Sequence, residues 1–93
     1  MKIESEEVEI RGKWTQSDAG VVEDGECQRI HGLISRYLVE VSRDESGWDI
    51  LYSDPSDGRF WELTYPESES PGGGPPRLRW LDEETARDKY DID

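Results

Sequence analysis

The segment GWDILYSDPSDGRFWELTYP at residues 47–66 decides the fold, together with ESESPGGGPPRLRWL at residues 67–81. These two segments hold three of the four tryptophans, two of the four tyrosines and the single phenylalanine. Within residues 48–53 and 59–65, every second residue is large and apolar. A period of two with aromatic and β-branched residues is typical of a half-buried strand. The segment therefore predicts two neighbouring strands.

Residues 54–58 predict a tight turn between these two strands. Asp54 can bond the backbone ahead of it, Pro55 presets φ, and Gly58 can adopt a positive φ without steric cost. A β-hairpin is therefore expected at the centre of the fold. Pro66 ends the second strand because proline has no N–H to donate. An acidic loop and a Gly/Pro turn at residues 72–76 then lead to a third strand at residues 77–81, in which leucine and tryptophan alternate with arginine.

The rest of the chain predicts one earlier strand and two helices. Residues 8–14 alternate in the same way and predict a strand, whereas residues 1–7 are acidic and expected to be frayed. Residues 24–42 predict a long helix, because one apolar stripe recurs at helical spacing in Ile30, Leu33, Ile34, Tyr37, Leu38 and Val41. Asp82 can cap a short last helix over residues 83–90, which has its acids first and its bases last.

These elements predict an α+β fold. We expect a small antiparallel sheet of about four strands built on the central β-hairpin, with one long helix packed on one face and a short C-terminal helix. A length of 93 residues favours a single domain over residues 1–93. The opposite face of the sheet is expected to be polar and to carry Asp49, Ser53, Glu62, Thr64, Arg77 and Arg79.

The charge balance favours a basic partner. Asp and Glu number 23 against 11 Lys and Arg, so the formal net charge is -12. This charge disfavours direct binding to nucleic acid or to an anionic membrane, since both require cations. Proteins that act on nucleic acid commonly have basic surfaces and are therefore suitable partners for this acidic chain. Solubility alone is the alternative explanation of the charge. No apolar run is long enough for a membrane helix and the N-terminus lacks a signal-peptide pattern, so a cytoplasmic location is expected.

Residues that could carry chemistry have simpler structural roles. Cys27 and His31 are the only residues of their types, which excludes a disulfide framework and a zinc cluster within this chain. Asp54, Asp57 and Glu62 could surround a hard cation, but turn chemistry explains the first two. The glycines at 72–74 lead into a strand and not into a helix, which argues against a phosphate cradle. We therefore expect no enzyme activity, no metal and no cofactor.

Aromatic and acidic residues occur together on the hairpin and the loop that follows it. Tryptophan and tyrosine often carry most of the energy of an interface, and acids steer a basic partner toward it. We expect most of these aromatic residues to fill the core and one or two to be partly exposed. Phe60 and Tyr65 are predicted to anchor a partner, while Glu62, Glu67 and Glu69 are predicted to steer it and to bond to it.

The same residues resemble the bacterial immunity protein 27 family of polymorphic toxin systems. The resemblance is carried by GWDILYSDPSDGRFWELTYP and GGGPP, with IRGKW at residues 10–14 and CQRI at residues 27–30, and it covers roughly residues 10–90. It implies a single-domain antidote that binds and blocks a cognate toxin domain inside the producing cell. The acidic charge agrees with a basic, nuclease-type toxin. The alternative is an acidic interaction module or nucleic-acid mimic that binds another basic protein.

Overall fold

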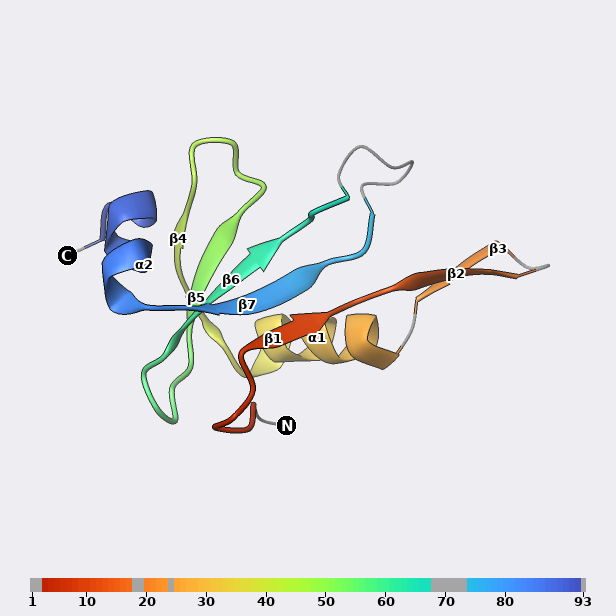
Figure 1. The fold of residues 1–93 in the computed structure, drawn as a ribbon, viewed down its shortest axis with the longest axis horizontal. Coiled ribbons are helices and arrows are strands. Elements are labelled where there is room, and N and C mark those ends of the chain that lie inside the picture. The colour runs from red at the N-terminus through yellow and green to blue at the C-terminus, as the bar shows by residue number, and fades with distance from the viewer. Residues whose placement is uncertain (1–2, 18–19, 24, 68–73, 93) are drawn as a thin grey trace.

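A five-stranded antiparallel sheet and two helices form the body of the protein (Figure 1). The computed structural model describes residues 3–17, 20–23, 25–67 and 74–92, with only the backbone of residues 15–17 and 20–23. The elements, in chain order, are β1 (Glu9–Arg11), β2 (Trp14–Ser17), β3 (Gly20–Glu23), α1 (Gly25–Arg36), β4 (Val39–Arg43), β5 (Ile50–Ser53), β6 (Phe60–Thr64), β7 (Arg77–Leu81) and α2 (Glu83–Tyr90). The sheet has the order β1-β7-β6-β5-β4, and β2 and β3 form a separate two-stranded ribbon that extends from the body.

The predicted central hairpin is confirmed. Strands β5 and β6 pair with Ile50 opposite Leu63, and β7 pairs along the other edge of β6. The turn is closed by a 2.7 Å hydrogen bond from the Gly58 N–H to the Asp54 carbonyl, and Gly58 has the positive φ of 77° that its turn position requires. The Asp54 carboxylate accepts the N–H of Ser56 at 2.8 Å, as an aspartate at the start of a turn commonly does.

The main core lies between α1 and one face of the sheet. Trp61 is fully buried at its centre and is surrounded by aliphatic side chains of both layers, namely Ile3, Ile10, Ile30, Leu33, Leu38, Leu63 and Leu78, together with Tyr52. Burial of such side chains contributes roughly 1.5–3 kcal/mol each to folding. The predicted alternation therefore identifies this face of the sheet correctly.

The long helix was predicted to be longer than it is. Helix α1 ends at Arg36, and Val39–Arg43 form the edge strand β4 instead of the last turns of the helix. Val41 fits the helical stripe, but Val39 and Val41 together fit the strand period of two, and β-branched residues favour the strand. The sheet therefore has five strands instead of about four.

The predicted strand over residues 8–14 is interrupted at Gly12 and Lys13, which separate β1 from β2. Gly12 donates a 2.9 Å hydrogen bond to the Pro76 carbonyl. A Cβ at this position would lie 2.5 Å from the Cys27 Sγ, so only glycine allows α1 to approach this closely.

The second face of the sheet is partly covered by α2. Asp82 caps this helix by accepting the Thr85 N–H at 2.8 Å, as predicted. Beneath the helix is a second apolar cluster of Leu51, Leu81, Ala86 and Tyr90, with Phe60 and Ile92 packed against it. The face expected to be polar thus also carries a buried apolar cluster where the helix covers it.

Residues 3–7 are held against the body, although the sequence suggested frayed residues at this end. Ile3 is buried in the main core. The Arg59 guanidinium donates hydrogen bonds of 3.0 Å to the carbonyls of Glu4 and Glu7. Arg29 of α1 binds the Glu7 carboxylate through two hydrogen bonds of 2.7 Å. Met1 and Lys2 lie outside the described residues.

Candidate partner-binding surface

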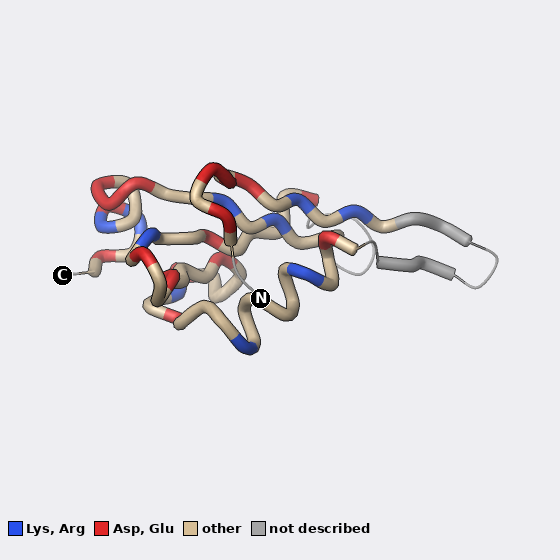
Figure 2. Tube along the Cα trace, turned by 90° about the horizontal axis from the view of Figure 1, so that it is seen from below, with Lys and Arg blue, Asp and Glu red and all other residues tan. Residues whose placement is uncertain are grey.

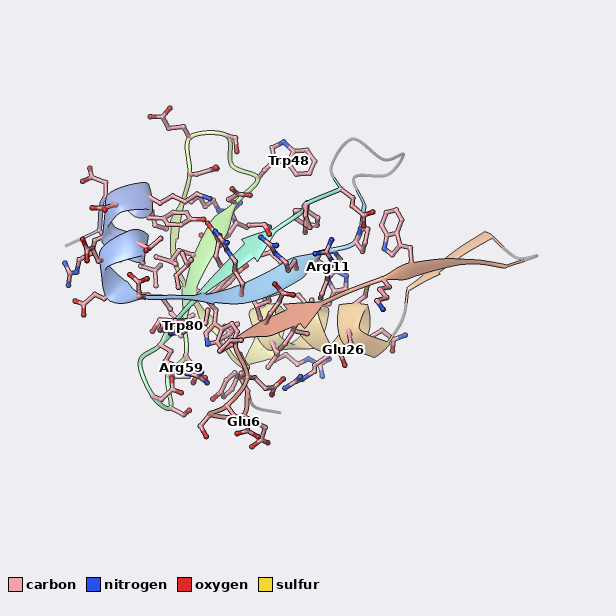
Figure 3. All side chains as sticks on the ribbon, viewed as in Figure 1. Glu6, Arg11, Glu26, Trp48, Arg59 and Trp80 are labelled. Carbon is pink, nitrogen blue, oxygen red and sulfur yellow. The ribbon has the colours of Figure 1, made fainter. Side chains whose placement is uncertain are left out.

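Trp48 projects from the loop between β4 and β5 and is the most exposed aromatic residue that the structure describes (Figure 3). Its side chain is 57% exposed, yet its ring packs edge-on against Tyr65 with the two centroids 5.8 Å apart. Tyr65 in turn packs against the main core. The indole is therefore exposed and supported from below, which suits an interface anchor.

The loop that carries Trp48 is internally bonded. Asp44 Oδ1 accepts hydrogen bonds from the Ser46 hydroxyl at 2.7 Å and from the Gly47 N–H at 2.9 Å. The Ser46 hydrogen bond is the main reason that the pKa of Asp44 is lowered. Gly47 adopts a φ of 78°, which places it in the left-handed region that favours glycine. The loop thus holds Trp48 in one position before any partner arrives, and preorganisation of this kind lowers the entropic cost of binding.

Of the residues predicted to bind a partner, Tyr65 contacts Trp48 and Glu67 follows Tyr65 in the chain. Tyr65 is half-buried beneath Trp48, and Glu67 follows it two residues later with an exposed side chain. Glu69 lies outside the described residues. Phe60 is at the other end of β6, where it is half-buried against the second apolar cluster. The sequence pattern missed Trp48 as an exposed anchor, although its position after the Asp44–Gly47 turn was a usable signal.

Glu62 occupies a position that the sequence did not predict. Its side chain is 0% exposed and faces α2. Arg79 Nε donates to its Oε1 at 2.9 Å, Tyr90 donates to its Oε2 at 2.7 Å, and Lys89 forms an ion pair with it. Burial tends to raise the pKa of Glu62, but the bonds from Lys89, Tyr90 and Arg79 outweigh that effect and the pKa is lowered. The carboxylate joins α2 to the sheet and is not on the surface.

A second exposed aromatic residue, Trp80, lies on the opposite side of β7 from Glu62 and Arg79. Trp80 is 41% exposed. Its backbone N–H donates a 2.9 Å hydrogen bond to the carbonyl of Val8, which is exposed as well. Unlike Trp48, it has no aromatic ring packed against it among the described residues.

Acidic residues are distributed in groups and do not form one face. Figure 2 shows Asp and Glu at several places on the body, with Lys and Arg interspersed among them. The exposed acids include Glu4 and Glu6 near the N-terminus, Glu45 beside Trp48, Asp57 in the hairpin turn, and Glu83, Glu84 and Asp88 on α2. A basic partner would therefore meet negative charge from several directions.

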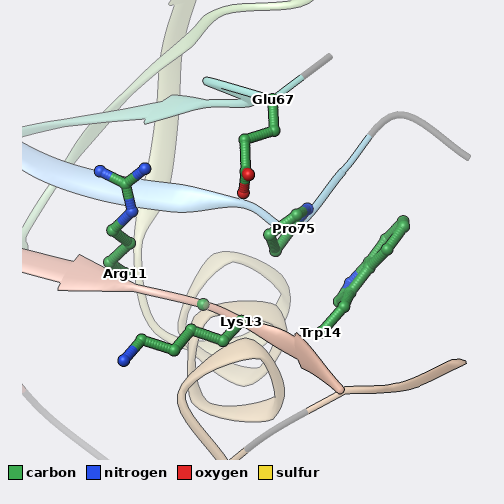
Figure 4. A pocket seen from close by; sticks show the side chains of 6 residues that line it. Arg11, Lys13, Trp14, Glu67 and Pro75 are labelled. Atoms are coloured by element: carbon green, nitrogen blue, oxygen red, sulfur yellow. The ribbon is translucent and has the colours of Figure 1, made fainter. Parts of the chain in front are cut away.

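A pocket of about 440 Å³ opens where β1 passes into β2 (Figure 4). Its lining comes from Arg11, Gly12, Lys13 and Trp14 on one side and from Glu67 and Pro75 on the other. Glu67 thus lines this pocket and comes two residues after Tyr65 in the connection that follows β6. Gly74 packs closely against Glu67, since a Cβ on Gly74 would lie 2.5 Å from the Glu67 carbonyl oxygen.

The residues considered as cation ligands have other partners. Asp54 accepts the Tyr37 hydroxyl at 2.7 Å, Asp57 pairs with Arg59 at 2.8 Å, and Glu62 is bound beneath α2. Within the described ranges, no group of three or more His, Cys, Asp or Glu residues is arranged to hold a metal ion. In the same part of the chain, no helix has the length and apolar character needed to cross a membrane.

Comparison with known proteins identifies one family. Residues 16–82, well over half of the chain, match the family model described as Immunity protein 27. No curated protein and no solved structure gave a significant match. The matched range includes α1, the central hairpin, Trp48, Tyr65 and β7. The chain therefore belongs to the immunity protein 27 family, which implies a role in neutralising a cognate toxin.

Proposed function

We propose that this protein neutralises its cognate bacterial toxin by binding and occluding the toxin domain in the cytoplasm, and that the toxin is a basic, nuclease-type effector. The supporting observation is the exposed Trp48 ring held against Tyr65, with Glu67 following on the same connection, in a chain with a net charge of -12. An aromatic anchor surrounded by charge that attracts a basic partner has the general character of a tight protein interface.

Occlusion of this kind needs no reaction by the inhibitor. Trp48 and Tyr65 provide the apolar contact, while Glu67 and Glu69 attract the toxin and accept hydrogen bonds from its Lys and Arg side chains. Phe60 and Glu62 act from within the fold, because Phe60 packs beneath α2 and Glu62 holds that helix on the sheet. Immunity proteins are generally not enzymes, and the proposed role is consistent with that.

Co-expression with the toxin domain encoded beside the gene tests the proposal. Growth should be rescued, and the two proteins should co-purify as a complex. A toxin that remains lethal in the presence of the folded protein, with no complex, would rule the proposal out. Equal binding to several unrelated basic proteins, with competition by DNA, would instead support an acidic interaction module or nucleic-acid mimic.

A matched pair of variants tests local steering. Glu67→Lys with Glu69→Lys and Glu83→Lys with Glu84→Lys each change the net charge from -12 to -8, by four units. If the Trp48 surface receives the toxin, the first pair should slow association by about tenfold and the α2 pair by much less. Equal slowing by both pairs would show that only the total charge matters.

A further inference from the structure

The pocket beside β1 has a rigid wall and a charged lining. Arg11 and Lys13 are exposed residues that both line the pocket, and Figure 4 shows their side chains on either side of the β1 chain, with the Trp14 indole farther along it. Gly12 between them is fixed by its hydrogen bond to Pro76 and by its contact with Cys27. The spacing of the two cations is therefore set by packed backbone.

Arg11 and Lys13 differ from most cations of this protein, because neither has an acidic partner among the residues that the structure describes. Seven other cations each lie within 4.0 Å of a carboxylate oxygen, namely Arg29, Arg43, Arg59, Arg77, Arg79, Arg87 and Lys89. Across the part of the chain that the structure describes, ion pairs are lacking only for Arg11, Lys13 and Arg36. In a chain with more than twice as many acids as bases, two cations at one pocket without an acidic partner among the described residues are available to an acid from outside.

The neighbouring groups strengthen the positive character of the site. Arg11 is directly opposite Arg77 in the β1–β7 pairing, and like charges in that position destabilise a sheet. The acid paired with Arg77 is Glu9, at the long distance of 3.9 Å, and the Arg77 Nε is buried without a hydrogen-bond partner among the described residues. The Trp14 Nε1 is likewise buried without a hydrogen-bond partner among the described residues. Buried polar atoms without a hydrogen-bond partner often mark a functional site.

We propose that this pocket is a binding site for an acidic side chain of the toxin, whose carboxylate pairs with the cationic wall formed by Arg11 and Lys13 and is flanked by Trp14 and Pro75. The proposal rests on the proposed function, since the toxin carries the acid. Glu67 at the other side of the pocket excludes a second negative group and can accept a hydrogen bond from a neighbouring donor. The pocket then fixes the orientation of a partner that the acidic surface attracts from a distance.

A single carboxylate suits this site better than a polyanion does. The net charge of -12 repels nucleic acid, and only a few cations are available to replace its counterions. An acidic residue on a basic protein does not meet this repulsion, because the net charge of its carrier is positive. The chemical class of the ligand is therefore a carboxylate on a protein surface.

Two variants of equal net charge distinguish binding at the pocket from the effect of the protein's total charge. Arg11→Gln with Lys13→Gln removes two positive charges, and Arg36→Glu exchanges one positive for one negative charge, so both change the net charge from -12 to -14. All three side chains are exposed, so both variants should fold. With a catalytically inactivated toxin domain, the pocket variant should weaken the Kd by about tenfold or more, which corresponds to the loss of one charge-assisted contact. The Arg36→Glu variant should bind as tightly as the wild type or slightly more tightly.

Two further measurements make the outcome decisive. A toxin Asp→Lys or Glu→Lys variant that binds the wild type weakly should regain affinity for Arg11→Glu with Lys13→Glu. A glutamate-containing peptide, titrated into the protein alone, should shift the Trp14 indole N–H resonance in the wild type but not in the Gln variant. Equal toxin affinities of the two matched variants, or tighter binding of inorganic phosphate than of the peptide, would overturn the proposal. If the wild type fails to bind the toxin, the proposed function fails, and a peptide titration without a shift would independently reject the pocket.

Discussion

The Tyr90 hydroxyl donates a 2.7 Å hydrogen bond to Glu62 Oε2 and so joins the last turn of α2 to the buried centre of β6. The same carboxylate is bound by Arg79 of β7 and by Lys89 of α2. One fully buried acid therefore connects β6, β7 and α2. A carboxylate without water contact depends on all of these donors, because a buried charge that loses a partner is costly.

Removal of the Tyr90 hydroxyl should destabilise the fold without unfolding it. We expect Tyr90→Phe to lower the free energy of unfolding by about 1.5–3 kcal/mol, the range for a hydrogen bond to a charged group. Arg87→Gln breaks only the exposed pair with Glu83 and should cost no more than about 0.5 kcal/mol. Urea unfolding followed by fluorescence and circular dichroism measures both. Coincident transitions would support the expected single domain, and equal losses for the two variants would contradict the proposed role of Glu62.

Acid should weaken the attachment of the N-terminal segment. The two hydrogen bonds from Arg29 lower the pKa of Glu7 to about 2, whereas its ordinary value is 4.5. A depressed pKa gives stability that is complete above pH 4.5 and is lost as the pH falls toward 2. Glu7→Gln should therefore have a shallower decline in unfolding free energy over this interval than the wild type. Urea titrations at a series of pH values test this, and parallel declines would contradict it.

The sequence predicted most reliably those elements whose local pattern fits only one secondary structure. The hairpin was predictable because the turn chemistry at 54–58 and the two alternating strands agree. The capped helix α2 was predictable for the same reason. The end of α1 was not, because Leu38 and Val41 continue the helical stripe while Val39 and Val41 fit the period of a strand. Pairing with β5 settles that ambiguity, and it is a long-range interaction that no local window contains.

The candidate site was only partly predictable, since exposure depends on what packs above each strand. Tyr65 and Glu67 lie at the proposed surface, but Glu62 is covered because α2 folds back over its face of the sheet. The composition gave no indication that Arg11 and Lys13 would remain unpaired. Whether a cation has an acidic partner depends on where the acids lie in three dimensions, which composition does not show.

The contact between Gly12 and Cys27 should make two substitutions interdependent. Gly12→Ala places a methyl group 2.5 Å from the Cys27 Sγ and 3.0 Å from the Pro76 carbonyl, and overpacking of this kind costs about 1–3 kcal/mol. Cys27→Ala removes the sulfur, so Gly12→Ala should cost less in that background. A double-mutant cycle from urea unfolding measures the coupling. Gly25→Ala, which meets nothing within 4 Å at the start of α1, is the control and should not be destabilising.

Trp48 and Trp80 offer the sharpest comparison for locating the toxin interface. Both indoles are exposed, but among the described residues only Trp48 has an aromatic ring, that of Tyr65, packed against it. If that surface receives the toxin, Trp48→Ala should weaken binding by about 2 kcal/mol or more, as truncation of a supported aromatic anchor does, while Trp80→Ala should change it by less than about 0.5 kcal/mol. Calorimetric titration of the inactivated toxin domain measures both affinities, with urea unfolding to confirm that each variant is folded. A larger loss for Trp80→Ala would place the interface over β7 and the Val8 segment instead, because the exposed apolar contact would then be on that side of the sheet.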